Sequence, residues 1–198
     1  MGIRERNRVR TQQQLAEAAL DLFLAKGFDE TTVDEVAERA GVSRRTFFRY
    51  FDSKEAAFFA NQEERLESFR VLLEARTAAE TALESVQRAC LAMARIYAAE
   101  RAVTLAQQRV VEASRQLKTY DQQLDAQWEE AMFDALLDDN NNDDSRLRAR
   151  VQAGAILGGV RAVLRAWFAQ DGRGDLELMG HRAFAVLSAG MAFTEMDR

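Results

Sequence analysis

The chain has 198 residues, of which 47% are hydrophobic, and a formal net charge of −5. It is long enough for one large domain, or for a small domain joined to a larger one. Proline is absent and helix formers dominate, so we expect an all-α fold.

The sequence indicates a soluble, cytoplasmic protein with no membrane partner. Its single cysteine, Cys90, excludes a disulfide framework or a cysteine metal site within one chain and favours a reducing compartment. The longest apolar runs, residues 153–168 and 183–193, contain arginine or are too short to span a bilayer. No N-terminal run resembles a signal peptide.

Positive charge is concentrated near the N-terminus, although the chain as a whole is acidic. Residues 1–10 and residues 43–54 each carry a local charge of +3. Because the position of charge matters more than its sum, a nucleic-acid partner is compatible with the acidic total. Residues 1–10 are either a flexible basic arm or the frayed start of a helix.

The first two predicted helices have clear boundaries. Residues 11–26 carry apolar side chains at helical spacing, and Gly27 ends that helix. Thr32 lies three residues before Glu35, the spacing of a capping box, and therefore opens a short second helix.

A third helix follows a tight turn at Gly41, with Ser43 as its N-cap. Two short helices joined by a glycine turn form a helix-turn-helix, whose second helix enters the DNA major groove. On a helical wheel one side carries Phe47, Tyr50 and Phe51, and the opposite side carries Arg45 and Arg49 with Phe48 beside them.

The exposed side of this third helix favours DNA. Arg44 and Arg45 lie in its first turn, where the helix dipole disfavours cations and an approaching phosphate is favourable. The alternative is an ordinary exposed helix with arginines on its solvated side.

Residues 28–55 resemble the DNA-binding domain of TetR/AcrR-type repressors. The resemblance lies in Thr31-Thr32-Val33, Val36-Ala37, Ala40-Gly41-Val42-Ser43, Thr46-Phe47-Phe48-Arg49-Tyr50-Phe51 and Ser53-Lys54-Glu55. It implies phosphate contacts by Thr32, Tyr50 and Lys54, base contacts by Arg44, Arg45 and Thr46, and either role for Arg49. The expected DNA surface is Thr32, Ser43, Arg44, Arg45, Thr46, Phe48, Arg49, Tyr50 and Lys54.

Two details of the operator follow. An arginine at a base edge most often binds guanine, so we expect a half-site that contains guanine. Phe48 stands where many family members carry tyrosine, so it has no hydroxyl for phosphate but can touch a thymine methyl group.

We place a domain boundary near residue 55, which gives a DNA-binding domain at 1–55 and a ligand-binding and dimerisation domain at 56–198. Ser53 caps a long helix that runs to about residue 75. Further helices are expected at 81–99, 101–113, 115–137, 146–170 and 175–196, for about nine in all.

The second domain is expected to hold an effector. Its methionine and aromatic residues suit a variable ligand, although for any single one of them simple core packing is the commoner explanation. The segment RRTFFRYF and the C-terminal pattern are similar to a subgroup of the family associated with acyl-CoA-like ligands. On that basis the candidate ligand-binding residues are Met93, Tyr97, Arg109, Tyr120, Trp128, Met132, Arg161, Arg165 and Trp167.

Small residues recur in the last two predicted helices. Glycine inside a helix costs up to about 1 kcal/mol against alanine, so the cluster indicates close packing, either against a second copy or within one chain. The resemblance implies a dimer joined through these two helices as a four-helix bundle. The expected interface contains Gly154, Gly158, Ala162, Ala183, Leu187 and Gly190.

No catalytic, cofactor or metal site is predicted. The sole histidine, His181, follows Glu177 by four residues. A di-iron bundle site needs a Glu-x-x-His motif on each of two helices, which a chain with one histidine cannot supply. Residues 138–144 lack the glycine and the final glutamate of a calcium loop. No nucleophile or phosphate loop is visible.

The leading hypothesis is a homodimeric repressor of a palindromic DNA operator, released by a small hydrophobic or acyl-CoA-like effector. Such release requires the effector to favour one spacing of the two recognition helices through its own binding energy. The first alternative is an architectural DNA-binding or scaffold protein without a small ligand. The second is a helical-bundle enzyme fused to a DNA-binding segment.

Overall fold

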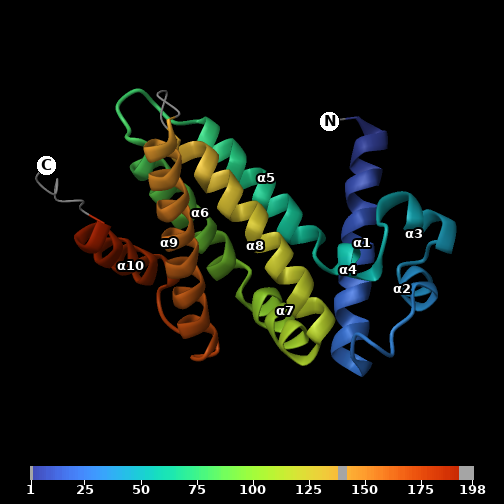
Figure 1. The fold of residues 1–198 in the computed structure, drawn as a ribbon. Coiled ribbons are helices and arrows are strands. Elements are labelled where there is room, and N and C mark those ends of the chain that lie inside the picture. The colour runs from blue at the N-terminus through green and yellow to red at the C-terminus, as the bar shows by residue number, and fades with distance from the viewer. Residues whose placement is uncertain (1, 138–141, 192–198) are drawn as a thin grey trace, which may run out of the picture. The chain divides into compact units, whose positions relative to one another are not determined.

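The computed structural model describes residues 2–137 and 142–191. Within these ranges the chain forms ten α-helices and no strand, which confirms the all-α fold (Figure 1). None of the helices in the same ranges is long and apolar enough to cross a membrane.

The contacts divide the chain into two compact units. The first unit comprises Met1–Leu66 and Ala106–Gln122, and the second comprises Glu67–Leu105 and Gln123–Arg198. The domain boundary expected near residue 55 stays a prediction.

The first unit contains the helix-turn-helix. Its N-terminal helices are α1 (Ile3–Lys26), α2 (Val33–Arg39), α3 (Arg44–Tyr50) and α4 (Lys54–Phe58). Helix α1 packs on α2 and α4, and α2 packs on α3 (Figure 1). The core of these helices includes Leu15, Ala19, Val36, Phe47 and Phe58, all buried. Because α1 begins at Ile3, most of the basic N-terminal segment belongs to a helix.

The predicted boundaries of these short helices are confirmed. Thr32 and Glu35 form both bonds of a capping box at the start of α2. The Ser43 hydroxyl accepts a hydrogen bond from the Thr46 amide and caps α3. Gly27 and Gly41 have φ values of 89° and 71°, a region that glycine enters without the steric cost of a side chain.

The single long helix expected after Ser53 is wrong. The chain forms α4 and then α5 (Ala60–Glu74), separated at Phe59, whose φ is −90° and ψ is 8°. Phe58 and Phe59 are 1% and 2% exposed, although neighbours on a continuous helix point about 100° apart. The break at Phe59 accompanies burial of both rings, and it accounts for the additional helix.

The remaining helices lie close to their predicted positions. They are α6 (Ala82–Ala99), α7 (Arg101–Ala113), α8 (Arg115–Leu136), α9 (Asp143–Phe168) and α10 (Leu176–Met191). Helix α9 starts three residues earlier than expected because the Asn142 side chain accepts a hydrogen bond from the Ser145 amide and caps it. The predicted continuation of the last helix beyond residue 191, and the loop at 138–141, lie outside the described residues.

In the second unit α10 packs on α9 and α6. The corner between α9 and α10 closes over Trp167, which is 1% exposed and whose indole Nε1 donates to the Gly174 carbonyl. Gly172 has a φ of 67°, and a Cβ atom there would lie 3.1 Å from the Trp167 ring. Arg101 donates to the carbonyls of Asp171 and Gly172, so the start of α7 is tied to this corner.

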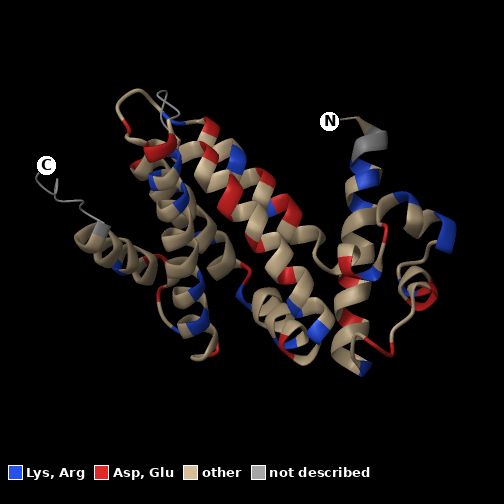
Figure 2. Ribbon diagram, in the orientation of Figure 1, with Lys and Arg blue, Asp and Glu red and all other residues tan. Residues whose placement is uncertain are grey.

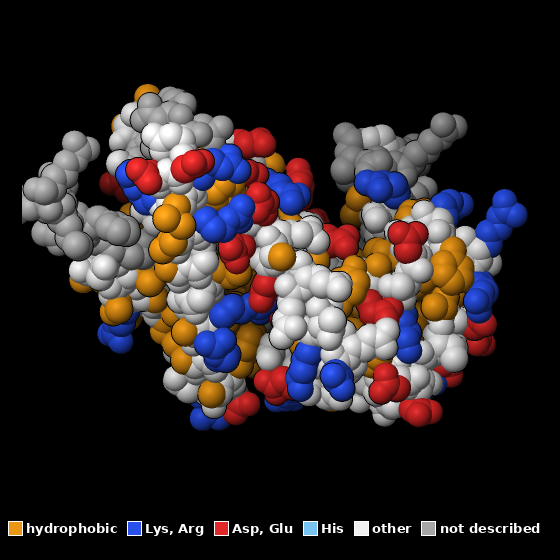
Figure 3. Space-filling view, viewed as in Figure 1, with side chains coloured by type: hydrophobic (Ala, Val, Ile, Leu, Met, Phe, Trp, Pro, Cys, Tyr) orange, Lys and Arg blue, Asp and Glu red, His pale blue; other side chains and the backbone are white. Residues whose placement is uncertain are grey.

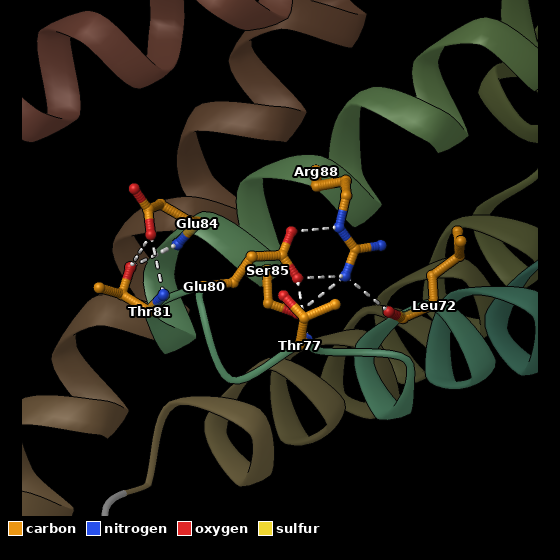
Figure 4. Close-up of polar contacts among 7 residues, drawn as sticks. All are labelled: Leu72, Thr77, Glu80, Thr81, Glu84, Ser85 and Arg88. Carbon is orange, nitrogen blue, oxygen red and sulfur yellow. Dashed lines mark hydrogen bonds and ion pairs between the residues drawn. The ribbon is translucent and has the colours of Figure 1, made fainter.

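The connection from α5 to α6 is held by Arg88 (Figure 4). Its guanidinium donates to both carboxylate oxygens of Glu80, at 2.7 and 3.2 Å, and to the Leu72 carbonyl at 3.2 Å. The hydrogen bonds from Arg88 hold the pKa of the Glu80 carboxyl below its usual range. Beside them Thr81 and Glu84 form a second capping box, which starts α6.

Replacement of Arg88 by alanine should therefore destabilise the fold. We expect the free energy of unfolding to fall by about 1–2 kcal/mol, because four hydrogen bonds, including one to the Ser85 hydroxyl, are lost and Glu80, 24% exposed, keeps its charge without its partner. Arg70→Ala is the matched control, since Arg70 and Glu67 form an exposed pair at 3.6 Å. Urea unfolding followed by circular dichroism measures both, and equal effects would contradict the role of Arg88.

Candidate nucleic-acid interface

Helix α3 has one buried and one exposed side. Phe47 and Phe51 are 0% and 6% exposed, and Tyr50 is half-buried. Arg45 and Arg49 are exposed on the other side, and 44% of Phe48 is accessible. The two sides predicted from the helical wheel are confirmed.

The charged residues of α3 are all basic, whereas those of α2 are mostly acidic. Figure 2 shows basic residues on α3 and on the part of α1 that follows its grey first turn, and acidic residues on α2. Ser43 and Thr46, both named as DNA contacts, are engaged with each other, because their hydroxyl oxygens lie 2.9 Å apart.

The three arginines of α3 have different surroundings. Arg44 donates to Asp34 of α2, with Nη1 2.7 Å from Oδ2, and lies 5.3 Å from the centre of the Phe48 ring. Arg49 lies over the Tyr50 ring at 4.9 Å. Arg45 makes no hydrogen bond or ion pair with any part of the chain that the structure describes. Among the arginines of α3, its guanidinium is therefore the one without a protein partner in the described parts of the chain.

Thr32 is exposed but already engaged. Its hydroxyl accepts from the Glu35 amide and donates to the Glu35 carboxylate. The Glu35 carboxyl also accepts from Lys26 at 2.6 Å, and these bonds, led by that from Lys26, lower its pKa to about 2. A phosphate contact by Thr32 stays a prediction.

Lys54 has a structural task that the sequence did not reveal. Its ammonium donates to the Phe28 carbonyl at 2.6 Å and the Thr31 carbonyl at 2.8 Å, and it lies 3.9 Å from the centre of the Phe28 ring. An ammonium has three protons, so one remains for another acceptor. These bonds connect the start of α4 to the loop before α2. The expected phosphate contact of Lys54 stays a prediction.

The candidate ligand-binding residues are distributed over both units. Arg109 and Tyr120 belong to the first unit. The second unit holds the others: Met93, Tyr97, Trp128, Met132, Arg161, Arg165 and Trp167.

Several of these side chains in the second unit are committed to the protein itself. Met93, Met132 and Trp167 are buried, and Trp128 packs on the ring of Phe69 at 5.0 Å. Arg161 donates two hydrogen bonds to Asp125, and Arg165 is exposed. The structure therefore shows core packing for most of them, and their role in ligand binding stays a prediction.

The sequence missed a set of contacts in the first unit that connects α4 to residues 106–122. Gln116 donates to Glu55, and Gln107 donates to the Phe58 carbonyl at 3.5 Å. The rings of Phe59 and Tyr120 stack, with their centres 5.0 Å apart. These contacts join residues 49 to 61 positions apart, a distance at which helical periodicity carries no signal.

No site for a metal or for catalysis emerges from the described residues. No group of three or more metal-binding side chains is found there. Glu177 accepts two hydrogen bonds from Arg95 of α6, and its carboxylate lies 3.8 Å from His181. Burial raises the pKa of the Cys90 thiol to about 12, which keeps it protonated.

Comparison with known proteins decides the family. Residues 15–60 match the profile of bacterial regulatory proteins of the tetR family, and residues 80–192 match that of the MftR C-terminal domain. The chain belongs to the TetR family. The regulator is therefore a DNA-binding transcription factor of that family and not an enzyme.

Two curated relatives illustrate the match. The regulator is 43% identical over 88 residues to the HTH-type transcriptional regulator TcmR of Streptomyces glaucescens, a match that spans 44% of this chain and 39% of TcmR. It is 26% identical over 186 residues to a Mycobacterium tuberculosis protein named as a mycofactocin biosynthesis transcriptional regulator, MftR. That second match covers 94% of this chain and 93% of MftR.

Solved structures show the same fold. The SmeT–triclosan complex has a TM-score of 0.66 at 19% identity and covers 91% of this chain and 90% of that one. The regulator FadR from Bacillus subtilis, in complex with stearoyl-CoA, has a TM-score of 0.62 at 18% identity. The match covers 90% of this chain and 98% of the FadR chain. At these identities the likeness concerns the fold alone.

Replacement of Lys54 in the regulator should affect stability as well as DNA binding. We expect Lys54→Ala to lower the free energy of unfolding by about 2 kcal/mol, because two carbonyls lose a charged donor and Phe28 loses its cation. Lys118→Ala, on the exposed surface of α8 in the same unit, is the control and should change little. Thermal unfolding measures the stability of both variants.

Proposed function

We propose that this TetR-family regulator is a cytoplasmic homodimeric repressor. In this proposal it binds a palindromic operator through α3 and leaves it when a small hydrophobic or acyl-CoA-like effector binds the C-terminal helices. The observation that carries the DNA-binding part is the exposed side of α3, where Arg45 has no protein partner among the described residues.

The assignment of DNA contacts follows from the two sides of α3. Burial of Phe47 and Phe51 fixes the rotation of the helix and turns Arg44, Arg45 and Arg49 outward. Arg44 and Arg45 lie in its first turn, the part of a recognition helix that contacts base edges. We therefore assign base contacts to these two and phosphate contacts to Tyr50, Thr32 and the remaining proton of Lys54.

The surface of α9 and α10 supports a dimer. Leu147 and Val151 are 65% and 53% exposed, and on the wheel they lie on the same side of α9 as Gly154, Gly158 and Ala162. Figure 3 shows hydrophobic side chains on the exposed face of α9. On α10, Val186 is 73% exposed. Exposed apolar side chains on both helices support an interface there.

The glycines separate into two groups. A Cβ atom at Gly159 would lie 3.0 Å from Leu187, and one at Gly180 would lie 2.9 Å from Leu91, so packing within the chain explains both. A Cβ atom at Gly158 or Gly190 would meet nothing within 4 Å. Gly158 and Gly190 therefore support contact with a second copy of the chain. We expect Ala183 to belong to the same interface.

The effector class is supported by the fold and its relatives. The neighbouring structures include FadR from Bacillus subtilis in complex with stearoyl-CoA and FadR from Thermus thermophilus in complex with lauroyl-CoA. In this chain Met93 and Met132 supply adaptable apolar side chains within the second unit. Because Arg161 is bound to Asp125, the exposed Arg165 is the better candidate for an anionic group.

We infer that contacts within the first unit carry the effector signal. The contacts of α4 with residues 106–122, through Gln116 and Tyr120, connect the helix that follows the recognition helix to parts of α7 and α8. An effector that prefers one position of α7 and α8 would shift α4 by its own differential binding energy.

The operator is found by selecting and sequencing DNA fragments that the purified protein retains. We expect inverted half-sites that contain guanine. Arg45→Ala should reduce the preference for one base by about 1–3 kcal/mol, which is about fivefold to 150-fold. Arg39→Ala is the control, because Arg39 pairs with Asp21 on α1 and is expected to leave the base preference unchanged. Unchanged selectivity in Arg45→Ala would sink its assignment to a base.

The effector is tested by thermal shift against acyl-CoAs of increasing chain length, with unacylated coenzyme A as control. We expect stabilisation that grows with the acyl chain, since each buried CH₂ group contributes about 0.8 kcal/mol. The stabilising compound must also release the operator. Stabilisation without release would favour a different effector class, and no response to any small ligand would favour an architectural DNA-binding protein.

A further inference from the structure

We infer that Asp34 is a positioning residue for sequence recognition: its carboxylate holds the Arg44 guanidinium so that the other edge of that group reads one base of the half-site. This inference rests on the proposed function, in which Arg44 faces the bases. Asp34 lies on α2, outside the recognition helix, and is not among the expected DNA contacts.

Arg44 is restrained by two contacts. Its Nη1 atom donates to Asp34 Oδ2 at 2.7 Å, and its guanidinium lies 5.3 Å from the centre of the Phe48 ring. Arginine has several rotatable bonds, and these contacts restrict them before DNA arrives. The guanidinium carries five N–H donors in a rigid fork, and the bond to Asp34 uses one of them.

The remaining donors suit guanine. Bidentate recognition of O6 and N7 needs two N–H groups that lie in one plane. With Nη1 bonded to Asp34, the side chain keeps N–H groups on Nε and Nη2 for a base. Arg45, the next residue, has no such restraint among the described residues, so the two neighbouring arginines differ in preorganisation although they share the same turn.

The ion pair with Arg44 adds little stability at this position. The side chains of Arg44 and Asp34 are 59% and 61% exposed, and ion pairs as exposed as this add little to the free energy of folding. The carboxylate also lies in the first turn of α2, where the helix dipole favours it whether or not Arg44 is its partner. A carboxylate beside a phosphate-binding surface also repels DNA. An orienting role gives a benefit that offsets this repulsion.

The same geometry permits an opposite role, in which Asp34 holds Arg44 away from DNA. The two roles predict opposite changes in specificity. Without its carboxylate partner, an arginine that was oriented loses discrimination between bases. An arginine that was withheld gains it.

Asp34→Asn tests the inference against a matched control, Asp21→Asn. Asp21 forms an exposed pair of the same kind with Arg39, at 2.6 Å and with side chains 55% and 53% exposed. Both variants remove one negative charge from the first unit. Affinities are measured at one salt concentration for the selected operator, for operators with each half-site base replaced, and for an unrelated duplex.

We expect Asp34→Asn to lower the discrimination at a single half-site position by about tenfold, because the bidentate contact loses its orientation. Its affinity for the unrelated duplex should stay equal or rise, since a repulsive charge has gone. Asp21→Asn should leave discrimination unchanged at every position. Arg44→Ala should abolish the preference at the same position, and the double variant should lose nothing further there.

Unchanged or increased discrimination in Asp34→Asn overturns the inference, as does a loss spread evenly over all positions. Circular dichroism and thermal unfolding establish that each variant is folded. A wild-type protein that selects an operator while Asp34→Asn behaves like Asp21→Asn refutes the role of Asp34 alone. A wild-type protein that selects no sequence refutes the proposed function.

Discussion

Burial of Phe47 is the contact on which the DNA-binding surface depends. Helix α3 has only seven residues, too few for a helix to be stable by itself in water, so it exists because its inner side packs in the first unit. Phe47 is 0% exposed, and this fixes the rotation of the helix about its axis. The arginines lie outward as a direct consequence. Gly41 and Ser43 determine where the helix starts, and Phe47 determines which side meets the ligand.

Local sequence signals predicted this part of the fold well, because each acts over three or four residues. The capping box at Thr32, the turn at Gly41 and the two sides of α3 depend on neighbours in sequence, and the structure confirms them. The break at Phe59 and the carbonyl contacts of Lys54 were missed. Both depend on partners that periodicity cannot identify: Lys54 binds the Phe28 carbonyl 26 positions earlier, and Phe59 stacks on the distant ring of Tyr120.

The candidate effector site was less predictable for the same reason. A methionine or an arginine on an apolar helix suits a ligand and a protein core equally, and only the tertiary partner distinguishes them. Arg161 looked available for an anionic ligand, but Asp125 on α8 engages it. Met132 is 1% exposed and packs as a core residue. Composition therefore indicated the kind of domain, whereas the roles of single residues required the structure.

Within the second unit, α10 is proposed to take part in dimerisation, and it is also bonded to α6, the helix that carries Met93. Helix α10 is joined to α6 through Arg95 and Glu177, and Gly180 brings its backbone against Leu91. On its other neighbour, Leu187 fits against Gly159 of α9. Because a packed core transmits displacement instead of absorbing it, a ligand that moves α6 must also move α10 or strain these contacts. In the proposed dimer such a movement would change the surface of α10 on which the partner subunit rests.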